Sequence, residues 1–152
     1  YRGRSVLTIE VDDRAFRAYW AQLQERLGDL SPALAAIGQE MESRISGRFE
    51  TQTDPRGVAW APWAKSTLDS YPADGNRRLL DRYGDLLASL NWRADASSVT
   101  VVFGQPYAAY HEWGTRRMPR RGLMFENPDA GTLAPDDERA IVDILADLLT
   151  VP

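Results

Sequence analysis

The amino-acid sequence predicts an α+β fold, in which a small and mainly antiparallel sheet packs against an N-terminal helical hairpin and a C-terminal helix. Three observations support this prediction. Residues 5–11 alternate between apolar and polar side chains, with the period of two that is typical of a half-buried strand. Residues 91–94 and 99–103 can form a hairpin around the polar turn 95–98. Three other segments repeat apolar residues at helical spacing.

The helical hairpin is expected between residues 12 and 49. Asp12 or Asp13 can cap a first helix, which Gly28 ends and whose apolar residues are Phe16, Tyr19, Trp20, Leu23 and Leu27. Ser31 followed by Pro32 predicts the N-cap and first turn of a second helix. An apolar stripe runs along it, formed by Leu34, Ile37, Met41, Ile45 and Phe49. The charged residues expected off that stripe are Glu40, Glu42, Arg44 and Arg48. Because the connection between the helices is short, we expect them to be antiparallel neighbours.

A long loop is predicted over about residues 51–78, where prolines and glycines interrupt any long element. A short helix around Lys65–Tyr71 is compatible with this segment. Its two tryptophans, Trp60 and Trp63, have two interpretations: they pin the loop to the core, or they contact a partner protein.

The C-terminal half contains shorter elements. A helix is expected over residues 84–90, after Leu79-Leu80, and a further one over Tyr107–Trp113 that Gly114 ends. Residues 123–125 predict a short strand. Pro135 opens the last helix, whose apolar face holds Ile141, Ile144, Leu145, Leu148 and Leu149. Its first turn carries Asp136, Asp137 and Glu138, which we interpret as helix-start stabilisation and not as a metal site.

Length and composition are those of one folded domain. The chain has 152 residues, of which 43% are hydrophobic and 26% charged. Residues 1–5 resemble a tag or vector remnant, so the domain is expected to be 6–150. No apolar run approaches the ~20 residues that span a bilayer, so no membrane is expected as a partner. Cysteine is absent, and the formal charge of −4 disfavours a dedicated duplex-binding protein.

The sequence offers little for catalysis. His111 is the only histidine, so a His-Glu-x-x-His zinc site cannot form. No Gly-x-Ser-x-Gly elbow and no phosphate-binding glycine loop occur. We therefore expect a protein that is not an enzyme, with no catalytic residue, cofactor or metal, and we interpret His111 as a packed structural residue.

Residues 107–122 concentrate the side chains that are typical of protein interfaces. They include three aromatic residues, His111 and the arginines Arg116, Arg117, Arg120 and Arg121. Aromatic rings cover large apolar areas, and arginine makes planar, forked hydrogen bonds. The arginines could form a solvated basic loop, contact nucleic-acid phosphates or dock on an acidic protein surface. Met118-Pro119 within the segment favours a mixed apolar and charged protein contact.

The order of features along the chain is similar to that of a known family. After the two predicted helices come Gln52, Pro55, Gly57, Trp60, Pro62 and Thr67, then residues 79–86 (LLDRYGDL) before the hairpin that ends at Gly104. Tyr107-Ala108 and residues 111–115 (HEWGT) follow. From about Val6 to Leu149 the chain resembles the phage virion morphogenesis, or tail-completion, family of Mu-like and related contractile-tailed phages and prophages. It departs at Tyr83, where the family tends to have threonine, and at residues 121–125, where RGLMF replaces Arg-Pro-Phe-Leu-Gly.

This resemblance implies a structural protein of the virion, assembled in the bacterial host cytoplasm, that completes the tail or neck as a ring and enables head–tail joining. A ring requires a heterologous, self-closing interface. The implied partners are further copies of the chain and other neck or tail proteins, with at most transient, nonspecific DNA contact. The candidate interface residues are Trp60, Trp63, Tyr107, Tyr110, His111, Trp113, Arg116, Arg117, Arg120 and Arg121.

Two alternatives belong to other classes. The first is a nucleic-acid-binding module that contacts the phage genome through Arg116–Arg121. The second is a hydrolase built around His111.

Overall fold

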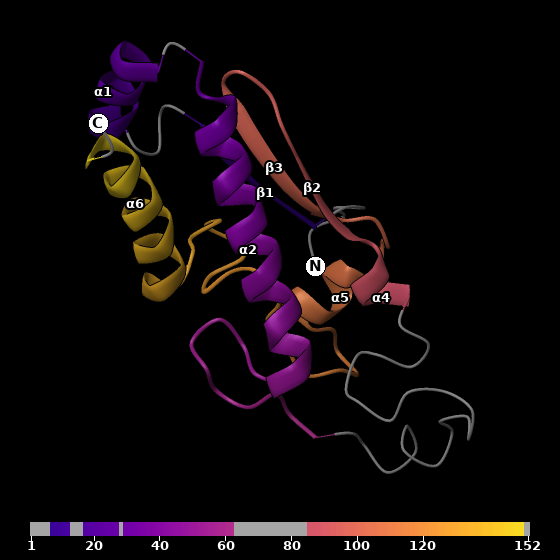
Figure 1. The fold of residues 1–152 in the computed structure, drawn as a ribbon. Helices are drawn as coiled ribbons and strands as arrows, with labels where there is room; N and C mark the ends of the chain where they lie inside the picture. Colours follow the sequence, from indigo (N-terminus) through magenta and orange to yellow (C-terminus); the bar gives the residue numbers. More distant parts are fainter. Residues whose placement is uncertain (1–6, 13–16, 28, 63–84, 151–152) are drawn as a thin grey trace.

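A long helix, α2 (Ser31–Thr51), crosses one face of a three-stranded sheet in the computed structural model of the protein (Figure 1). The structure describes residues 7–12, 17–27, 29–62 and 85–150. Around α2 the chain places β1 (Leu7–Asp12), α1 (Arg17–Leu27), α4 (Asp85–Ala88), β2 (Leu90–Ala94), β3 (Ser98–Phe103), α5 (Ala108–Trp113) and α6 (Pro135–Thr150). The predicted α+β class is confirmed.

The sheet has the strand order β1-β3-β2, and both neighbouring pairs are antiparallel. The predicted hairpin is confirmed: the backbone N–H of Asp95 donates to the carbonyl of Ser98, and the Asp95 carboxylate accepts the N–H groups of Ser97 and Ser98, each at 2.8 Å. The alternation read from the sequence of β1 is also confirmed, because Leu7, Ile9 and Val11 are all buried.

The core lies between the sheet, α2 and α6. The predicted apolar stripe of α2 has no exposed surface at any of its five residues, and Val99, Val101 and Phe103 of β3 face it from the sheet. The apolar face of α6 completes the core through Ile141 and Leu145. Burial of this apolar area is the main stabilising contribution to the fold.

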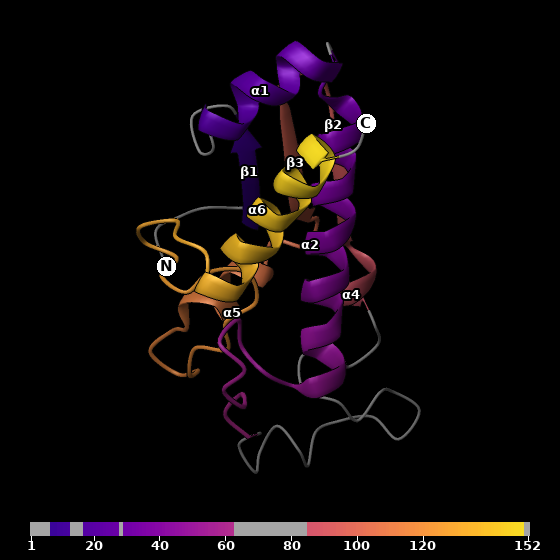
Figure 2. The same cartoon turned by 60° about the vertical axis from the view of Figure 1, so that its left-hand side comes forward.

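The predicted pairing of the first two helices is wrong. α1 packs against α6 and not along α2, and Figure 2 shows it lying across one end of the molecule. The connection is short, as expected, but α1 packs on α6, whose apolar residues Ile144, Leu148 and Leu149 lie beside the core. A helix buries its apolar stripe against another element, which need not be the one next to it in the sequence.

The predicted N-cap of α2 is also wrong. Ser31 lies inside the helix, and Leu30 takes the cap position without any side-chain hydrogen bond. Asp29 instead accepts hydrogen bonds from the Ser31 N–H at 3.0 Å and hydroxyl at 2.8 Å. These bonds, led by the backbone one, lower the pKa of Asp29. Pro32 does lie in the first turn, as predicted.

Part of the predicted long loop is ordered by backbone hydrogen bonds. Gln52 ends α2 in the left-handed conformation with a φ of 57°, and Thr53 and Ala59 then form an isolated bridge around the turn at Asp54–Gly57. Several predictions lie outside the described residues: the remnant at 1–5, the Asp13 cap, Phe16, Trp63, the helix around residues 65–71 and Leu79-Leu80. Within the described ranges, no helix is long and apolar enough to cross a membrane.

Candidate protein-docking site

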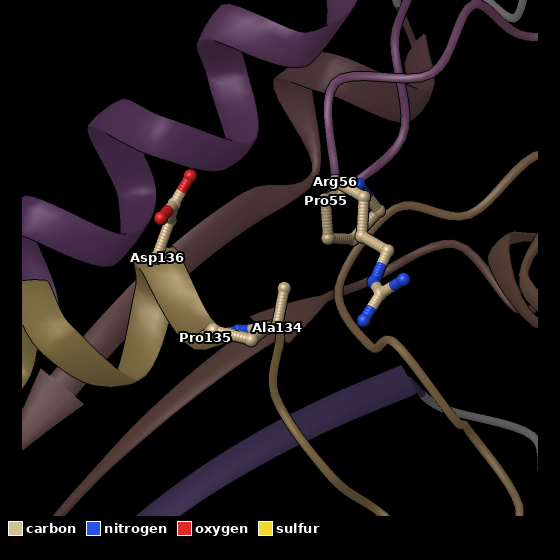
Figure 3. Close-up of a pocket in the computed structure, with 5 residues that line it drawn as sticks. All are labelled: Pro55, Arg56, Ala134, Pro135 and Asp136. Carbon is tan, nitrogen blue, oxygen red and sulfur yellow. The ribbon is translucent and has the colours of Figure 1, made fainter.

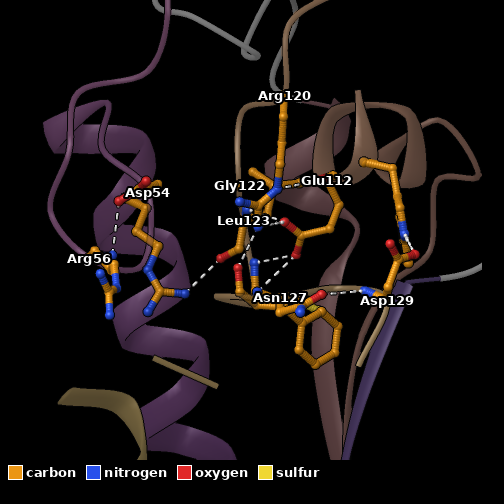
Figure 4. Close-up of polar contacts among 12 residues, drawn as sticks. Asp54, Arg56, Glu112, Arg120, Gly122, Leu123, Asn127 and Asp129 are labelled. Atoms are coloured by element: carbon orange, nitrogen blue, oxygen red, sulfur yellow. Dashed lines mark hydrogen bonds and ion pairs between the residues drawn. The ribbon is translucent and has the colours of Figure 1, made fainter. Parts of the chain in front are cut away.

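Glu112, on the inner side of α5, organises the segment that the sequence identifies as a candidate site (Figure 4). Its side chain has no exposed surface, and its two oxygens accept the backbone N–H groups of Leu123, Met124 and Phe125 at 3.0, 2.8 and 2.9 Å. The Arg120 guanidinium adds a contact of 3.2 Å. Burial raises the pKa of Glu112, while these donors oppose that shift by stabilising the carboxylate.

This carboxylate explains why the predicted strand at residues 123–125 is wrong. No neighbouring strand pairs with the segment in the described structure. Its N–H groups bind Glu112 instead, and its carbonyls bind side chains: Leu123 accepts from Arg48 at 2.6 Å, and Phe125 from Arg120 at 2.6 Å. Leu123, Met124 and Phe125 are buried, as their apolar character requires. Side chains therefore satisfy backbone groups that a sheet would otherwise pair.

A tight turn follows α5. Gly114 ends the helix with a φ of 75°, and a Cβ added there would lie 3.0 Å from the backbone nitrogen of Arg120, so the chain needs glycine to fold back this closely. Thr115 and Met118 then exchange backbone hydrogen bonds at 3.0 and 3.3 Å. Arg116 and Arg117 occupy the tip of this turn, and both are exposed. Their guanidinium groups make no ion pair or hydrogen bond with the part of the chain that the structure describes.

The other two arginines of the cluster bind groups of the protein itself, and Arg121 is buried whereas Arg120 is partly exposed. Arg120 donates from Nε to the Glu112 carbonyl at 2.6 Å and from Nη2 to the Glu112 carboxylate and the Phe125 carbonyl. Arg121 is only 7% exposed and binds the carbonyls of Ala61 and Pro62 at 2.8 and 2.9 Å. The structure thus divides the cluster. Arg116 and Arg117 point away from the described residues, Arg120 fastens the turn to α5 and to Phe125, and Arg121 fastens it to the preceding loop at Ala61 and Pro62.

The outer side of α5 carries exposed aromatic side chains. Ala108, Ala109 and Glu112 form its buried side, so Tyr107 and Tyr110 face outward and are 37% and 42% exposed. Such exposure is unusual for large aromatic residues and is typical of binding surfaces. Burial, with the nearby Asp85 carboxylate, raises the pKa of Tyr107, so its phenol stays protonated.

His111 lies half-buried between Tyr107 and Arg121. Its ring meets the Tyr107 ring edge to face at 6.3 Å, and its Nδ1 atom is buried without a hydrogen-bond partner in the described structure. Burial, and secondly the positive charge of Arg121, lowers its pKa to about 4. His111 is therefore neutral at physiological pH and packed as a structural residue.

The candidate tryptophans differ in exposure. Trp60 is 5% exposed, packs edge-on against Phe49 at 5.5 Å and donates to the Gly122 carbonyl at 2.9 Å. It therefore pins its loop to the core, as one of the two sequence interpretations holds. Trp113 is half-buried and donates to the Asp129 carboxylate at 2.9 Å. We call Tyr107, Tyr110, Trp113, Arg116 and Arg117 the aromatic–arginine surface.

Features that would support small-molecule chemistry are weak here. The described residues hold no group of three side chains suited to a metal ion. A pocket of about 250 Å³ lies between the turn at residues 54–57 and the start of α6 (Figure 3). Of its lining residues Pro55, Arg56, Ala134, Pro135 and Asp136, only Arg56 and Asp136 are charged, and Arg56 is paired with Glu126 outside the pocket lining. No nucleophile with an adjacent base lines this pocket.

Comparison with known proteins supplies the family. Residues 11–150 match the model of the phage virion morphogenesis family. The chain belongs to that family. The protein therefore has a structural role in virion assembly, and the family predicted from the sequence is confirmed. Its placement among Mu-like phages stays a prediction. Comparison with curated proteins and with solved structures finds no match.

Two structural residues of this virion morphogenesis protein were missed or misplaced in the sequence analysis. Arg48 was expected off the apolar stripe of α2 but is 6% exposed and pairs with Asp137, whose side chain is fully buried. Arg44 adds a contact to Asp137 at 3.6 Å. The sequence spacing does indicate this burial, because Arg48 lies three residues after Ile45 and seven after Met41 and is therefore on the apolar side of the helix. Glu112 likewise shares a side of α5 with Ala108 and Ala109.

Proposed function

We propose that this protein completes the tail or neck of a phage particle as a ring of copies and thereby enables the head to join. Membership of the virion morphogenesis family supports a structural role. The position at the tail end or neck is supported only by the resemblance of the sequence to tail-completion proteins. In this proposal the aromatic–arginine surface docks on an adjacent neck or tail protein.

The observation that carries the docking role is the exposure of Arg116 and Arg117 in the turn that directly follows α5, the helix that bears the exposed Tyr110 and begins after the exposed Tyr107. Both arginines lie at the tip of a turn closed by two backbone hydrogen bonds, so little backbone entropy is lost when they bind. Glu112 and Arg120 hold the base of that turn from inside. A preorganised base under exposed aromatic and guanidinium groups is what a binding hot spot needs.

Complementation of a phage that lacks this gene tests the proposal. Tyr110→Ala combined with Arg117→Glu should leave the protein folded but reduce the yield of joined particles by at least about tenfold, since each change removes a hot-spot contact. Electron microscopy should then show full heads apart from unjoined tails. Arg139→Glu is the control, because Arg139 is exposed on α6, far along the chain from the surface. Normal particle yield with the double variant would contradict the docking role.

Nucleic-acid binding through Arg116–Arg121 is the alternative. Because only two arginines of the cluster are exposed at the turn tip, the expected salt dependence of DNA binding is small. Two available arginines can neutralise about two phosphates, so raising salt from about 50 to 200 mM should weaken DNA binding only about tenfold. Titration of labelled duplex DNA measures this. A much steeper salt dependence with tight binding would favour the nucleic-acid module over the docking role.

A further inference from the structure

The outer strands of the three-stranded sheet, β1 and β2, have outer edges that no described strand pairs. β1 and β2 each pair with β3, and neither has a second strand beside it in the described structure. β2 lies at the outer margin of the molecule in Figure 1, and β1 lies at the opposite margin of the sheet in Figure 2. An open edge exposes unpaired N–H and carbonyl groups, which form a template for another strand.

The two edge strands carry opposite charges in the same row of the sheet. Glu10 of β1 and Arg93 of β2 both pair with Thr100 of β3, so all three lie in one row across the sheet, on the face away from α2. Glu10 and Arg93 are exposed and make no ion pair with any described residue. In the next row, Thr8 and Asn91 both pair with Val102.

We infer that copies of this chain join edge to edge, with β2 of one copy hydrogen-bonded to β1 of the next, so that one sheet continues around the ring. The inference rests on the proposed function in one respect, which is that the copies form a closed ring. A strand added at the usual spacing of about 4.8 Å places Glu10 of one copy beside Arg93 of its neighbour. Thr8 then lies beside Asn91.

The strand directions suit a ring. β1 and β2 are both antiparallel to β3 and are therefore parallel to each other. Each junction is then a parallel pair, and every copy points the same way along the ring axis, as cyclic symmetry requires. An antiparallel pair of two β1 edges centred on Glu10 would bring Glu10 against Glu10, and a pair of two β2 edges centred on Arg93 would bring Arg93 against Arg93; other registers would leave these charges without an opposite partner. The charges thus disfavour closed two-copy pairing and favour head-to-tail addition.

The inner side of β2 also leaves room for a neighbour. Val99 and Val101 in the central strand are fully buried, whereas Trp92 and Ala94, on the same side of edge strand β2, are only half-buried. A neighbouring β1 would bring Ile9 next to Trp92, because Ile9 and Trp92 share the row of Val101. The junction would therefore cover apolar surface that one copy leaves exposed.

Disulfide trapping tests the junction directly, because the chain has no cysteine of its own. The variant with Thr8→Cys and Asn91→Cys places one thiol on each edge. After oxidation, in particles or in concentrated protein, it should run as a ladder of covalent multimers that ends at the ring size. Each single-cysteine variant should stay monomeric. Dimers from a single-cysteine variant, or no multimers from the double variant in finished particles, would overturn the inference.

Charge exchange gives a second measurement that does not depend on disulfide geometry. Glu10→Arg or Arg93→Glu alone should weaken each junction about tenfold, and the two together should restore it. Failure of the double exchange to restore multimers would contradict the edge pairing. Normal particle yield without a ladder would overturn the junction and leave the proposed function intact. If the double-cysteine variant formed the ladder but phage lacking the gene still gave normal particles, the junction would stand and the proposed function would be overturned.

Discussion

Met124 donates its backbone N–H at 2.8 Å to the fully buried carboxylate of Glu112, and the N–H groups on either side of it bind the same carboxylate. One glutamate on a six-residue helix thus holds an apolar segment that no neighbouring strand pairs. The same residue binds Arg120, which closes the base of the turn that presents Arg116 and Arg117. The fold and the proposed docking surface therefore depend on the same side chain.

Replacing Glu112 with glutamine should lower the free energy of unfolding by about 2–4 kcal/mol. The glutamine amide offers one acceptor oxygen and turns a donor NH2 group towards N–H groups that need acceptors. Urea denaturation measures the loss. Glu138→Gln is the matched control, because Glu138 is exposed in the first turn of α6 and should lose less than about 1 kcal/mol. Equal losses for the two variants would contradict the role given to Glu112.

Local patterns in the sequence predicted the elements that depend on local chemistry. The turn at Asp95–Ser98 followed from its polar residues, and α6 followed from its proline, its acidic first turn and its apolar spacing. The end of α5 at Gly114 followed from a glycine beyond a short helix. In each of these cases, residues near one another in the chain determine the structure.

The features that depend on distant residues were not predictable in this way. An apolar run such as Leu123–Phe125 has the composition of a strand, and only the position of Glu112 in space shows that a carboxylate replaces the neighbouring strand. α1 packs against α6, which lies more than a hundred residues later in the chain, and not along the adjacent α2. The division of the arginine cluster depends on carbonyls at Ala61 and Pro62, about sixty residues away. The spacing of residues along the chain does not indicate contacts between segments this far apart.

The ion pair between Arg48 and Asp137 gives a second prediction about stability. Desolvation raises the pKa of Asp137, against the opposing effect of the two arginines, and its carboxylate joins α2 to the start of α6. Asp137→Asn should cost about 3–5 kcal/mol, because it leaves the buried Arg48 charge without its counter-ion. Asp136→Asn, one residue earlier and exposed, should cost less than about 1 kcal/mol. Thermal or urea unfolding compares the two variants, and a similar cost at both positions would count against the pair.

Two glycines of α2 should respond to alanine with opposite signs. A Cβ at Gly38 would lie 2.7 Å from the Trp92 ring, so Gly38→Ala should destabilise by about 1–2 kcal/mol through overpacking. A Cβ at Gly47 meets nothing within 4 Å, so Gly47→Ala should stabilise by about 0.5–1 kcal/mol through helix propensity. Urea unfolding of both variants and of the unaltered chain measures the two changes in the free energy of unfolding. If Gly38→Ala were also stabilising, that result would contradict the close contact of Gly38 with the Trp92 ring of β2.

His111 gives the protein a predicted dependence on pH. Its pKa is lowered to about 4 by burial and by the charge of Arg121, whereas the unfolded chain holds a histidine pKa near its ordinary value of about 6.5. Between these values the unfolded state binds more protons. Stability is therefore complete above about pH 6.5 and falls as pH falls towards 4.

The measurement is a comparison of His111→Gln with the unaltered chain across this pH range. We expect the unaltered chain to lose about 3 kcal/mol more than the variant between pH 7 and pH 4. Glu112 and Asp137 have raised pKa values and act in the opposite direction, but both proteins retain them, so their effect cancels in the difference. Parallel curves for the two proteins would show that His111 accepts its proton without cost and is not held neutral by its surroundings. Particle yield at neutral pH should be unchanged by His111→Gln, because His111 is half-buried and lies outside the aromatic–arginine surface. Complete loss of yield from a folded variant would place His111 in the docking contact itself.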